Sequence, residues 1–325
     1  MVSNSRSVSV IVFLLISTLI SVDNCYSQQY DYFKLLHGTY LGNSSSTRHV
    51  VTAVGLDNTG NILVCGWGNG IPTTIGTYQP QNAGEWDGFI CKLSADLSTL
   101  IWGTYIGGIS NDRIDDMSIG SDGSIYFIAS GGVDFPSTNS VDSLYRAQGN
   151  GVAVCKLSAD GSQLIYSRFI GVYGATSIYP IDYLPLSGLS ITISPQNEVF
   201  VAGVASTNPN LFFKTSNAYQ STIAGSTDIF FTKLSSTGTI LYSTYFGGNG
   251  QDYAGRLCYT NGKVYLCGIT TSSNFPLATG KSYSSPGDCF VMSWNDGATP
   301  TPNTVYLFGS SSTDYCKSIC YNQNT

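Results

Sequence analysis

The 325-residue sequence predicts an all-β fold, a β-propeller built of four-stranded antiparallel blades. Two observations carry this prediction. A short motif of bulky apolar residues followed by glycine returns five times, at intervals of about 62 to 76 residues, which is typical of a repeat architecture. Its five glycines are Gly42, Gly107, Gly171, Gly247 and Gly309. In addition, no segment beyond the N-terminus has the 3.6-residue apolar period of a helix, whereas each repeat holds four short apolar runs.

The elements of one repeat follow each other in a fixed order. An apolar strand with a Lys-Leu ending comes first, as in 89–93, 153–157 and 230–234. A polar turn with Asp-Gly or Thr-Gly follows it, and the next strand, such as 240–245, ends in the glycine motif. Further on, a second hairpin turns at Asn261-Gly262, the dipeptide that most strongly indicates a two-residue hairpin loop. Each repeat therefore contains the four strands of one blade.

The spacing predicts about four complete blades and one partial blade. The expected domains are a signal peptide at 1–27 and a propeller domain at 28–325, whose units cover approximately 33–88, 89–151, 152–228, 229–289 and, in part, 290–325. The strand order begins with a lone outer strand at 36–41 and ends with a lone inner strand at 317–320. We therefore expect an incomplete ring, with further repeats in the full product. A β-solenoid is the alternative, although its coils are usually shorter than about 30 residues.

The pattern of the repeat resembles the SBBP family of seven-bladed β-propeller repeats. The matching residues are 228–234, 241–248, Asp252, 262–268 and Asn274-Phe275-Pro276. The resemblance covers nearly the whole chain after the N-terminal segment, and the third unit diverges most. It implies a propeller in a secreted or cell-surface protein, and it implies no shared catalytic residue.

The N-terminus has the pattern of a secretory signal peptide. Residues 1–7 hold one arginine, an apolar run extends from Val8 to about Val22, and small residues favour cleavage after Ser27. A run of about 15 residues is short for a membrane span, which needs about 20. An uncleaved anchor is the alternative. We expect a secreted or cell-surface protein without a membrane span once this segment is removed.

Composition restricts the class of partner. The net charge of −6 and the pI near 4.7 argue against nucleic acid, because phosphate neutralisation requires a concentrated basic surface. The 14 lysines and arginines are scattered along the chain. Few charges together with many hydroxyl and amide side chains suit a surface that binds a glycan or a protein.

The cysteines follow the repeat. Of the 9 cysteines, Cys25 lies in the predicted signal peptide, and most others occupy repeat positions that hold small or apolar residues in sister copies. We therefore expect buried thiols. The alternative is cross-strand disulfides, for example between Cys65 and Cys91. A zinc site is not expected, because the sequence has no Cys-x-x-Cys pair.

No catalytic constellation stands out in the sequence. The only histidines are His37, expected on a half-buried strand, and His49, expected in a solvated loop. Neither accompanies a recognisable nucleophile, and no Gly-x-Ser-x-Gly motif occurs.

Acidic residues recur at one position of the repeat. Asp112, Asp252 and Asp314 each lie five residues after a repeat glycine. Such recurrence favours a structural role, in which the carboxylate caps a turn by accepting backbone N–H bonds. Calcium coordination and paired-carboxylate glycosidase chemistry are the alternatives. Asn43 begins an Asn-Ser-Ser sequence that could accept a glycan.

These observations predict a non-catalytic binding or adhesion scaffold with a glycan or protein partner at a propeller face. One alternative is an exported enzyme, such as a glycoside hydrolase or lyase, and another is a structural spacer in a larger surface protein. An acid/base pair that is unique to one blade and points into the central channel would favour the enzyme. Residues that recur in every blade favour the scaffold.

Overall fold

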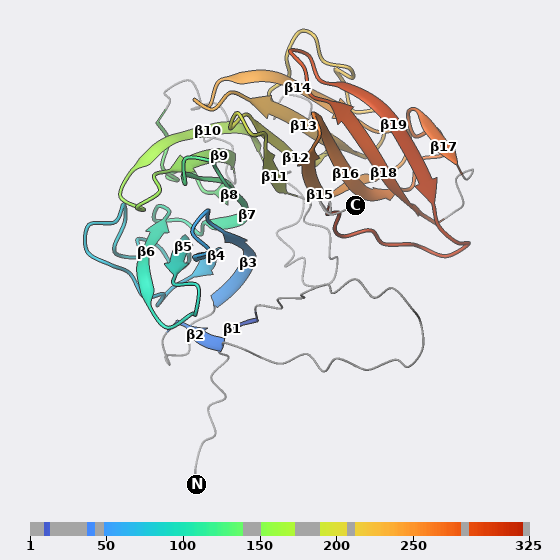
Figure 1. Ribbon diagram of the computed structural model, residues 1–325. Coiled ribbons are helices and arrows are strands. Elements are labelled where there is room, and N and C mark those ends of the chain that lie inside the picture. The colour runs from blue at the N-terminus through green and yellow to red at the C-terminus, as the bar shows by residue number, and fades with distance from the viewer. Residues whose placement is uncertain are drawn as a thin grey trace, which may run out of the picture.

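The computed structural model describes residues 10–13, 38–42, 49–138, 151–172, 189–206, 212–280 and 286–320. The regular secondary structure of these residues consists of strands alone. The four complete blades are four separate sheets, each built around four antiparallel strands (Figure 1). The predicted all-β propeller architecture is confirmed.

In each blade the strands follow one another from the inner to the outer edge of the sheet. The first blade contains β3 (His49–Leu56), β4 (Ile62–Gly68), β5 (Asp87–Leu93) and β6 (Leu100–Ile106). The second contains β7 (Arg113–Ile119), β8 (Ile125–Gly131), β9 (Gly151–Leu157) and β10 (Leu164–Val172). The third contains β11 (Ser190–Ile193), β12 (Val199–Ser206), β13 (Thr227–Leu234) and β14 (Ile240–Phe246). The fourth contains β15 (Asp252–Thr260), β16 (Lys263–Thr270), β18 (Asp288–Asn295) and β19 (Thr301–Phe308).

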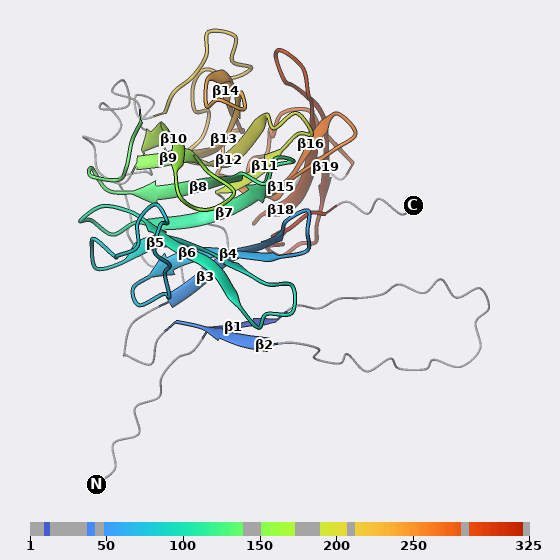
Figure 2. The ribbon, with the colours of Figure 1, turned by 60° about the vertical axis from the view of Figure 1, so that its left-hand side comes forward.

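The blades fan out around their inner strands, which are neighbours in the order β3, β7, β11, β15 (Figure 2). Clusters of buried residues join the first blade to the second, the second to the third and the third to the fourth, and within the described ranges none joins the fourth to the first, so the ring is open. The predicted lone outer strand is β2 (Gly38–Leu41), which pairs with β1 (Val10–Phe13) from the segment predicted to be a signal peptide. No helix long and apolar enough to cross a bilayer occurs in the described part of the chain.

The prediction of an inner strand at 317–320 is wrong. Residues 309–320 follow β19 without regular secondary structure. In every complete blade the inner strand pairs only with the second strand of its own sheet, and within the described residues no such strand follows here. The segment nevertheless begins like an inner strand. The backbone N–H of Asp314 donates to the Gly287 carbonyl at 3.2 Å, as that of Asp112 donates to the Trp86 carbonyl at 2.8 Å.

The predicted hairpin turns are confirmed. Asn261 and Gly262 connect β15 to β16 with φ values of 49° and 71°, the pair of positive values that a type I′ turn requires. Gly161 and Gly238 close the turns between the third and outer strands of the second and third blades, with φ values of 73° and 84°. These turns set the register in which apolar side chains face the neighbouring blades.

The core consists of layers between successive blades. One cluster of buried residues joins the first and second blades, a second joins the second and third, and a third joins the third and fourth. The last of these contains Phe231 stacked on Trp294, with ring centroids 4.2 Å apart. A fourth cluster lies on the other face of the first blade and includes Leu41 of β2. Burial of both sheet faces explains why the strands read as nearly continuous apolar runs.

The alternative expectation of a bridge between Cys65 and Cys91 is wrong. Val64, and not Cys65, is the cross-strand partner of Cys91, so the two thiols point to opposite faces of the sheet. Cys65 packs between the first and second blades, Cys91 packs on the opposite face, and both are free. The expectation of buried thiols is confirmed for both residues, each with 0% exposure.

The lysine of the Lys-Leu ending ties each of the first three blades together at one end. Lys92 forms an ion pair with Asp57 of the turn between β3 and β4, at 2.8 Å. Lys156 pairs in the same way with Asp122 at 3.2 Å, and its ammonium lies 4.8 Å from the centre of the Tyr126 ring. The recurring lysine is therefore a structural residue that links the third strand to the first turn of its own blade.

Loops between the second and third strands fold back over the outer strand of each blade. Backbone N–H groups of Thr74, Thr138 and Thr215 donate to carbonyls of β6, β10 and β14 at 3.1, 3.4 and 3.2 Å. In the fourth blade this loop forms β17 (Ala278–Gly280), which pairs in parallel with β19 and was not predicted. These loops, which we call the clasp loops, place polar and aromatic side chains at the rim of the molecule.

Candidate functional site: a pocket between the second and third blades

The recurring carboxylates of Asp112 and Asp252 hold the starts of the inner strands β7 and β15. Asp112 accepts hydrogen bonds from the backbone N–H groups of Gly108 at 2.6 Å and Gly132 at 2.9 Å. Asp252 accepts the N–H of Gly248 at 2.7 Å and the hydroxyl of Ser272 at 2.9 Å. Burial raises the pKa of both carboxyls to about 6. The predicted capping role matches these contacts.

A second set of buried carboxylates explains the repeat glycine. Asp87 and Asp228, both with 0% exposure, begin the third strands of the first and third blades. A methyl group added at Gly107 would lie 2.6 Å from Cγ of Asp87 and 2.8 Å from Oδ2 of Asp112. At Gly247 the corresponding distances are 2.5 Å to Cγ of Asp228 and 2.7 Å to Oδ2 of Asp252. The glycine is therefore required by close packing between two carboxylates.

The other predicted site residues have separate surroundings. Asp314 accepts a hydrogen bond from the Ser310 backbone at the end of the fourth blade, so Asp112, Asp252 and Asp314 belong to different blade junctions. Within the described ranges, no three His, Cys, Asp or Glu side chains are grouped as metal ligands. Asn43 lies outside the described residues. His49 was predicted in a solvated loop, but it begins β3 and is buried against Gly42, and burial lowers its pKa.

An ion pair fills the centre of the fan. Asp116 on β7 pairs with the guanidinium of Arg256 on β15, and its other oxygen accepts the Ser190 hydroxyl at 2.9 Å and the Ile191 N–H at 3.0 Å. Arg256 also donates to the Thr52 carbonyl on β3 at 3.3 Å. This network therefore links the inner strands of all four blades. Both oxygens of Asp116 are occupied by protein partners, which suits a structural tie more than a proton-transfer group.

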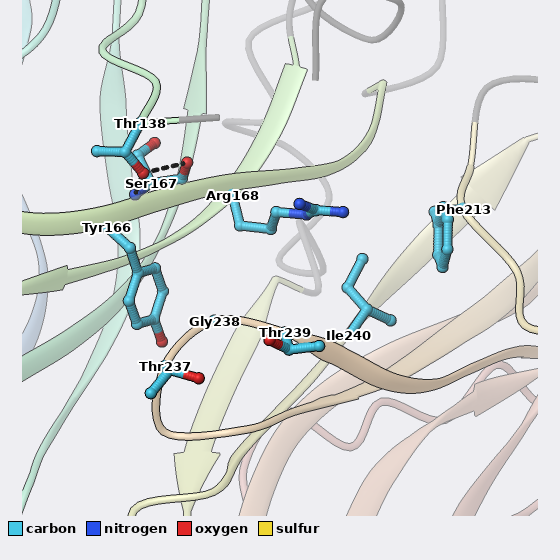
Figure 3. A pocket seen from close by; sticks show the side chains of 9 residues that line it. All are labelled: Thr138, Tyr166, Ser167, Arg168, Phe213, Thr237, Gly238, Thr239 and Ile240. Atoms are coloured by element: carbon cyan, nitrogen blue, oxygen red, sulfur yellow. Dashed lines mark hydrogen bonds between the residues drawn. The ribbon is translucent and has the colours of Figure 1, made fainter. Parts of the chain in front are cut away.

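A pocket of about 270 Å³ opens at the rim between the second and third blades. Its lining residues come from β10, from the turn before β14 and from two clasp loops (Figure 3). They are Thr138, Tyr166, Ser167, Arg168, Phe213, Thr237, Gly238, Thr239 and Ile240. The pocket thus combines hydroxyl groups, two aromatic rings and one guanidinium.

Local packing sets the shape of this pocket. Gly238 approaches the ring of Tyr166 so closely that an added methyl group would lie 2.9 Å from a ring carbon. The side chain of Arg168 extends along the pocket toward Phe213 and Ile240 (Figure 3). Thr138 is held in place because its hydroxyl accepts the Ser167 N–H at 3.0 Å. The rigid turn and the clasp loop therefore form opposite walls.

Arg168 departs from the repeat at this position. The sister residues are Thr104 and Thr244, both buried, whose hydroxyls accept the backbone N–H groups of Gln79 and Gln220 at 2.9 Å. In the second blade the same position holds a half-buried arginine that lines the pocket. Arg168 is not among the site residues predicted from the sequence. The available signal was the replacement of threonine by arginine within an otherwise regular motif.

No known protein family matches the sequence, and no curated protein matches it. Among solved structures, the chain is similar to a luciferin-regenerating enzyme, with 11% identity and a TM-score of 0.33 over 68% of this chain and 54% of that one.

Two further solved structures show similarity at the same level. An α-L-arabinofuranosidase from Clostridium thermocellum has 11% identity and a TM-score of 0.36, over 80% of this chain and 72% of that one. A protein of unknown function from Dyadobacter fermentans has 12% identity and a TM-score of 0.40, over 80% and 69%. The four sheets of the chain itself show the propeller architecture.

Proposed function

We propose that the chain is an exported, non-catalytic binding scaffold that holds a glycan in the pocket between the second and third blades. The observation that carries this proposal is the presence of Arg168 in the pocket, at a position where the sister blades have threonine. The sister threonines Thr104 and Thr244 hold the clasp-loop backbone of their own blades, and at the same position of the second blade Arg168 breaks the repeat and lines the pocket. A departure from the repeat at a pocket is where a specific function is expected.

The chemistry of the pocket favours a sugar as the ligand. Ligand sites combine apolar and aromatic walls with a few polar groups that fix orientation. Here the hydroxyls of Thr138, Thr237 and Thr239 can exchange hydrogen bonds with sugar hydroxyls, and Phe213 offers an apolar ring. The planar guanidinium of Arg168 matches a carboxylate in a two-point hydrogen bond. An acidic sugar, such as a uronic acid unit, is therefore the glycan class that fits best.

The carboxylates at the centre support the non-catalytic part of the proposal. Asp116 is bonded to Arg256, Ser190 and a backbone N–H. Its neighbour Asp115 pairs with Arg113 at 2.8 Å and accepts the Ser130 hydroxyl at 2.9 Å. Protein groups thus bond both oxygens of each of these two carboxylates, which favours a structural role over proton transfer. Export is supported by the signal-peptide pattern of residues 1–27.

Glycan binding by the purified protein tests this proposal. A glycan array that includes acidic oligosaccharides should identify a ligand, and titration calorimetry should then give its affinity. Arg168→Thr introduces the residue of the sister blades, and we expect it to weaken binding about tenfold or more because a charge-assisted hydrogen bond is lost. Lys263→Thr removes one positive charge on the hairpin of the fourth blade and should leave the affinity unchanged.

Two results would contradict the proposal. One is the absence of binding to any glycan on the array, and the other is equal affinity of the wild type and Arg168→Thr. Calcium chelation should not change the affinity, since the oxygens of Asp112 and Asp252 already accept hydrogen bonds from the protein.

A further inference from the structure

Three thiols meet on the outer face of the fourth blade. Cys267 lies on β16, Cys289 lies on β18, and Cys316 lies in the segment that follows β19. The cross-strand register places Cys267 and Cys289 on the same face of the sheet. The Cys316 side chain interacts with both of them, which contributes to raising the pKa of each. A methyl group added at Gly255 would lie 3.0 Å from the Cys316 carbonyl oxygen and 3.1 Å from the Sγ atom of Cys267. The segment after β19 thus returns to the inner strand β15 (Figure 1).

The position of Cys316 holds an apolar residue where one complete blade meets the next. Cys316 corresponds to Ile114 and Ala254, because each lies two residues after the recurring aspartate. Ile114 packs so closely on the first blade that a methyl group at Gly88 would lie 2.8 Å from its side chain. Ala254 is buried between the third and fourth blades. After the fourth blade, thiols occupy the three facing positions, which makes this junction chemically different.

We infer that Cys316 and Cys267 form a disulfide under oxidising conditions, and that this bridge clamps the C-terminal segment onto the fourth blade. The bridge joins the two sides of this junction covalently, whereas packed apolar side chains join the other junctions. It closes a loop of about 50 residues, and a disulfide of this kind stabilises a protein mainly by restricting the unfolded chain. This inference does not rest on the proposed glycan binding.

The oxidant is a small-molecule or protein disulfide, and the electrons balance in two exchange steps. The Cys316 thiol loses its proton, and its sulfur attacks the disulfide, forming a mixed disulfide and releasing one thiol. The Cys267 sulfur then loses its proton and attacks the Cys316 sulfur, which releases the second thiol. Two protein thiols are oxidised and one disulfide is reduced. Cys316 reacts first because it is half-exposed, whereas Cys267 is buried.

Cys267 is the preferred partner because its side chain and the Cys316 backbone lie at the same point beside Gly255. Cys289 is the third thiol of the group and also contacts Cys316. Burial raises the pKa of Cys267 to about 12 and that of Cys289 to about 11, so neither is an efficient first nucleophile at neutral pH. Once the bridge has formed, Cys289 is left as a reduced thiol.

Peptide mapping of the full chain can distinguish the pairings. The purified protein is incubated with oxidised or reduced glutathione, alkylated under denaturing conditions and digested with trypsin. Cleavage after Lys263, Lys281 and Lys317 places Cys267 in one peptide, and Cys289 together with Cys316 in the next. We expect oxidised protein to yield a cross-link between these two peptides. A pair of Cys289 and Cys316 would instead give an internal loop in the second peptide.

Cysteine variants complete the test. The cross-link should be lost in Cys316→Ser and retained in Cys289→Ser, and Cys320→Ser serves as the matched control because Cys320 is an exposed cysteine four residues further on. Oxidation should raise the Tm of the wild type by about 5 °C or more, and it should not raise that of Cys316→Ser. Complete alkylation of Cys267 after oxidation, or a cross-link that persists in Cys316→Ser, would overturn the inference.

Discussion

Gly107 shows why one residue type recurs at the end of each outer strand. It lies between the side chains of Asp87 and Asp112, and both carboxylates are buried. Gly247 has the same surroundings in the third blade, between Asp228 and Asp252. The glycine is retained because any side chain would displace a buried carboxylate from its hydrogen-bond donors.

Gly107→Ala should therefore destabilise the protein. The added methyl group would lie within 2.8 Å of both carboxylates, and we expect a loss of about 2 to 3 kcal/mol in the free energy of unfolding. Chemical denaturation measures this loss. Gly297→Ala is the control, because the nearest atom to its added methyl group lies at 3.9 Å. Equal stability of the two variants would show that the carboxylates can move apart at little cost.

At the scale of single residues, the sequence predicted structural roles better than binding roles. The capping function of Asp112 and Asp252 could be predicted because the residue recurs at a fixed distance from a glycine. Burial of Cys65 and Cys91 was predicted correctly, whereas the alternative of a bridge between them could be decided only by the cross-strand register, which determines the face that each thiol occupies. Arg168 went unnoticed because its meaning depends on a pocket shared by two blades.

The inner strands form the element that holds the fan together. Their connection through Asp116 and Arg256 joins residues far apart in the sequence, so no local pattern could predict it. The strands and hairpins could be predicted from alternation and turn residues. The missing strand at 317–320 and the added strand β17 could not, because both depend on which partner strand is adjacent.

Arg256→Ala should weaken this connection. It leaves the buried carboxylate of Asp116 without its cation, and we expect a loss of about 1 to 3 kcal/mol in the free energy of unfolding, since the arginine is partly exposed. The double variant with Asp116→Asn should recover about 1 kcal/mol or more of that loss. Denaturant titration of the complete mutant cycle measures the coupling, and strictly additive effects would argue against the tie.

For the whole molecule, the buried carboxylates predict an unusual dependence of stability on pH. The folded-state pKa values of Asp112 and Asp252 are raised to about 6 from 3.8, so the folded protein binds these protons more tightly than the unfolded chain. Their contribution is complete below pH 3.8 and is lost as pH rises through 6. The free energy of unfolding should fall by about 5 kcal/mol between about pH 4 and 7, roughly half of it from each carboxyl.

Other aspartates set the acidic limit of this range. Hydrogen bonds from Ser94 and Ser158 lower the pKa of Asp96 and Asp160 to about 2, so their contribution is present above pH 3.8 and lost as pH falls further. Stability should therefore be greatest near pH 4. Asp252→Asn should reduce the slope between pH 4 and 7, because it removes one of the two titrating groups. A slope of opposite sign in the wild type would refute the assignment.

The clasp loops have a consequence for how copies of the molecule meet in concentrated solution. The outer strand of a blade has one free edge, whose backbone N–H and C=O groups lack a partner strand. Such an edge can pair with a strand from another molecule and begin aggregation. In the first three blades, a clasp loop donates a backbone hydrogen bond to a carbonyl of the outer strand, from Thr74 to β6, from Thr138 to β10 and from Thr215 to β14. In the fourth blade, β17 pairs with β19. The loops that shape the rim thus also block fibre-like growth from the four outer edges.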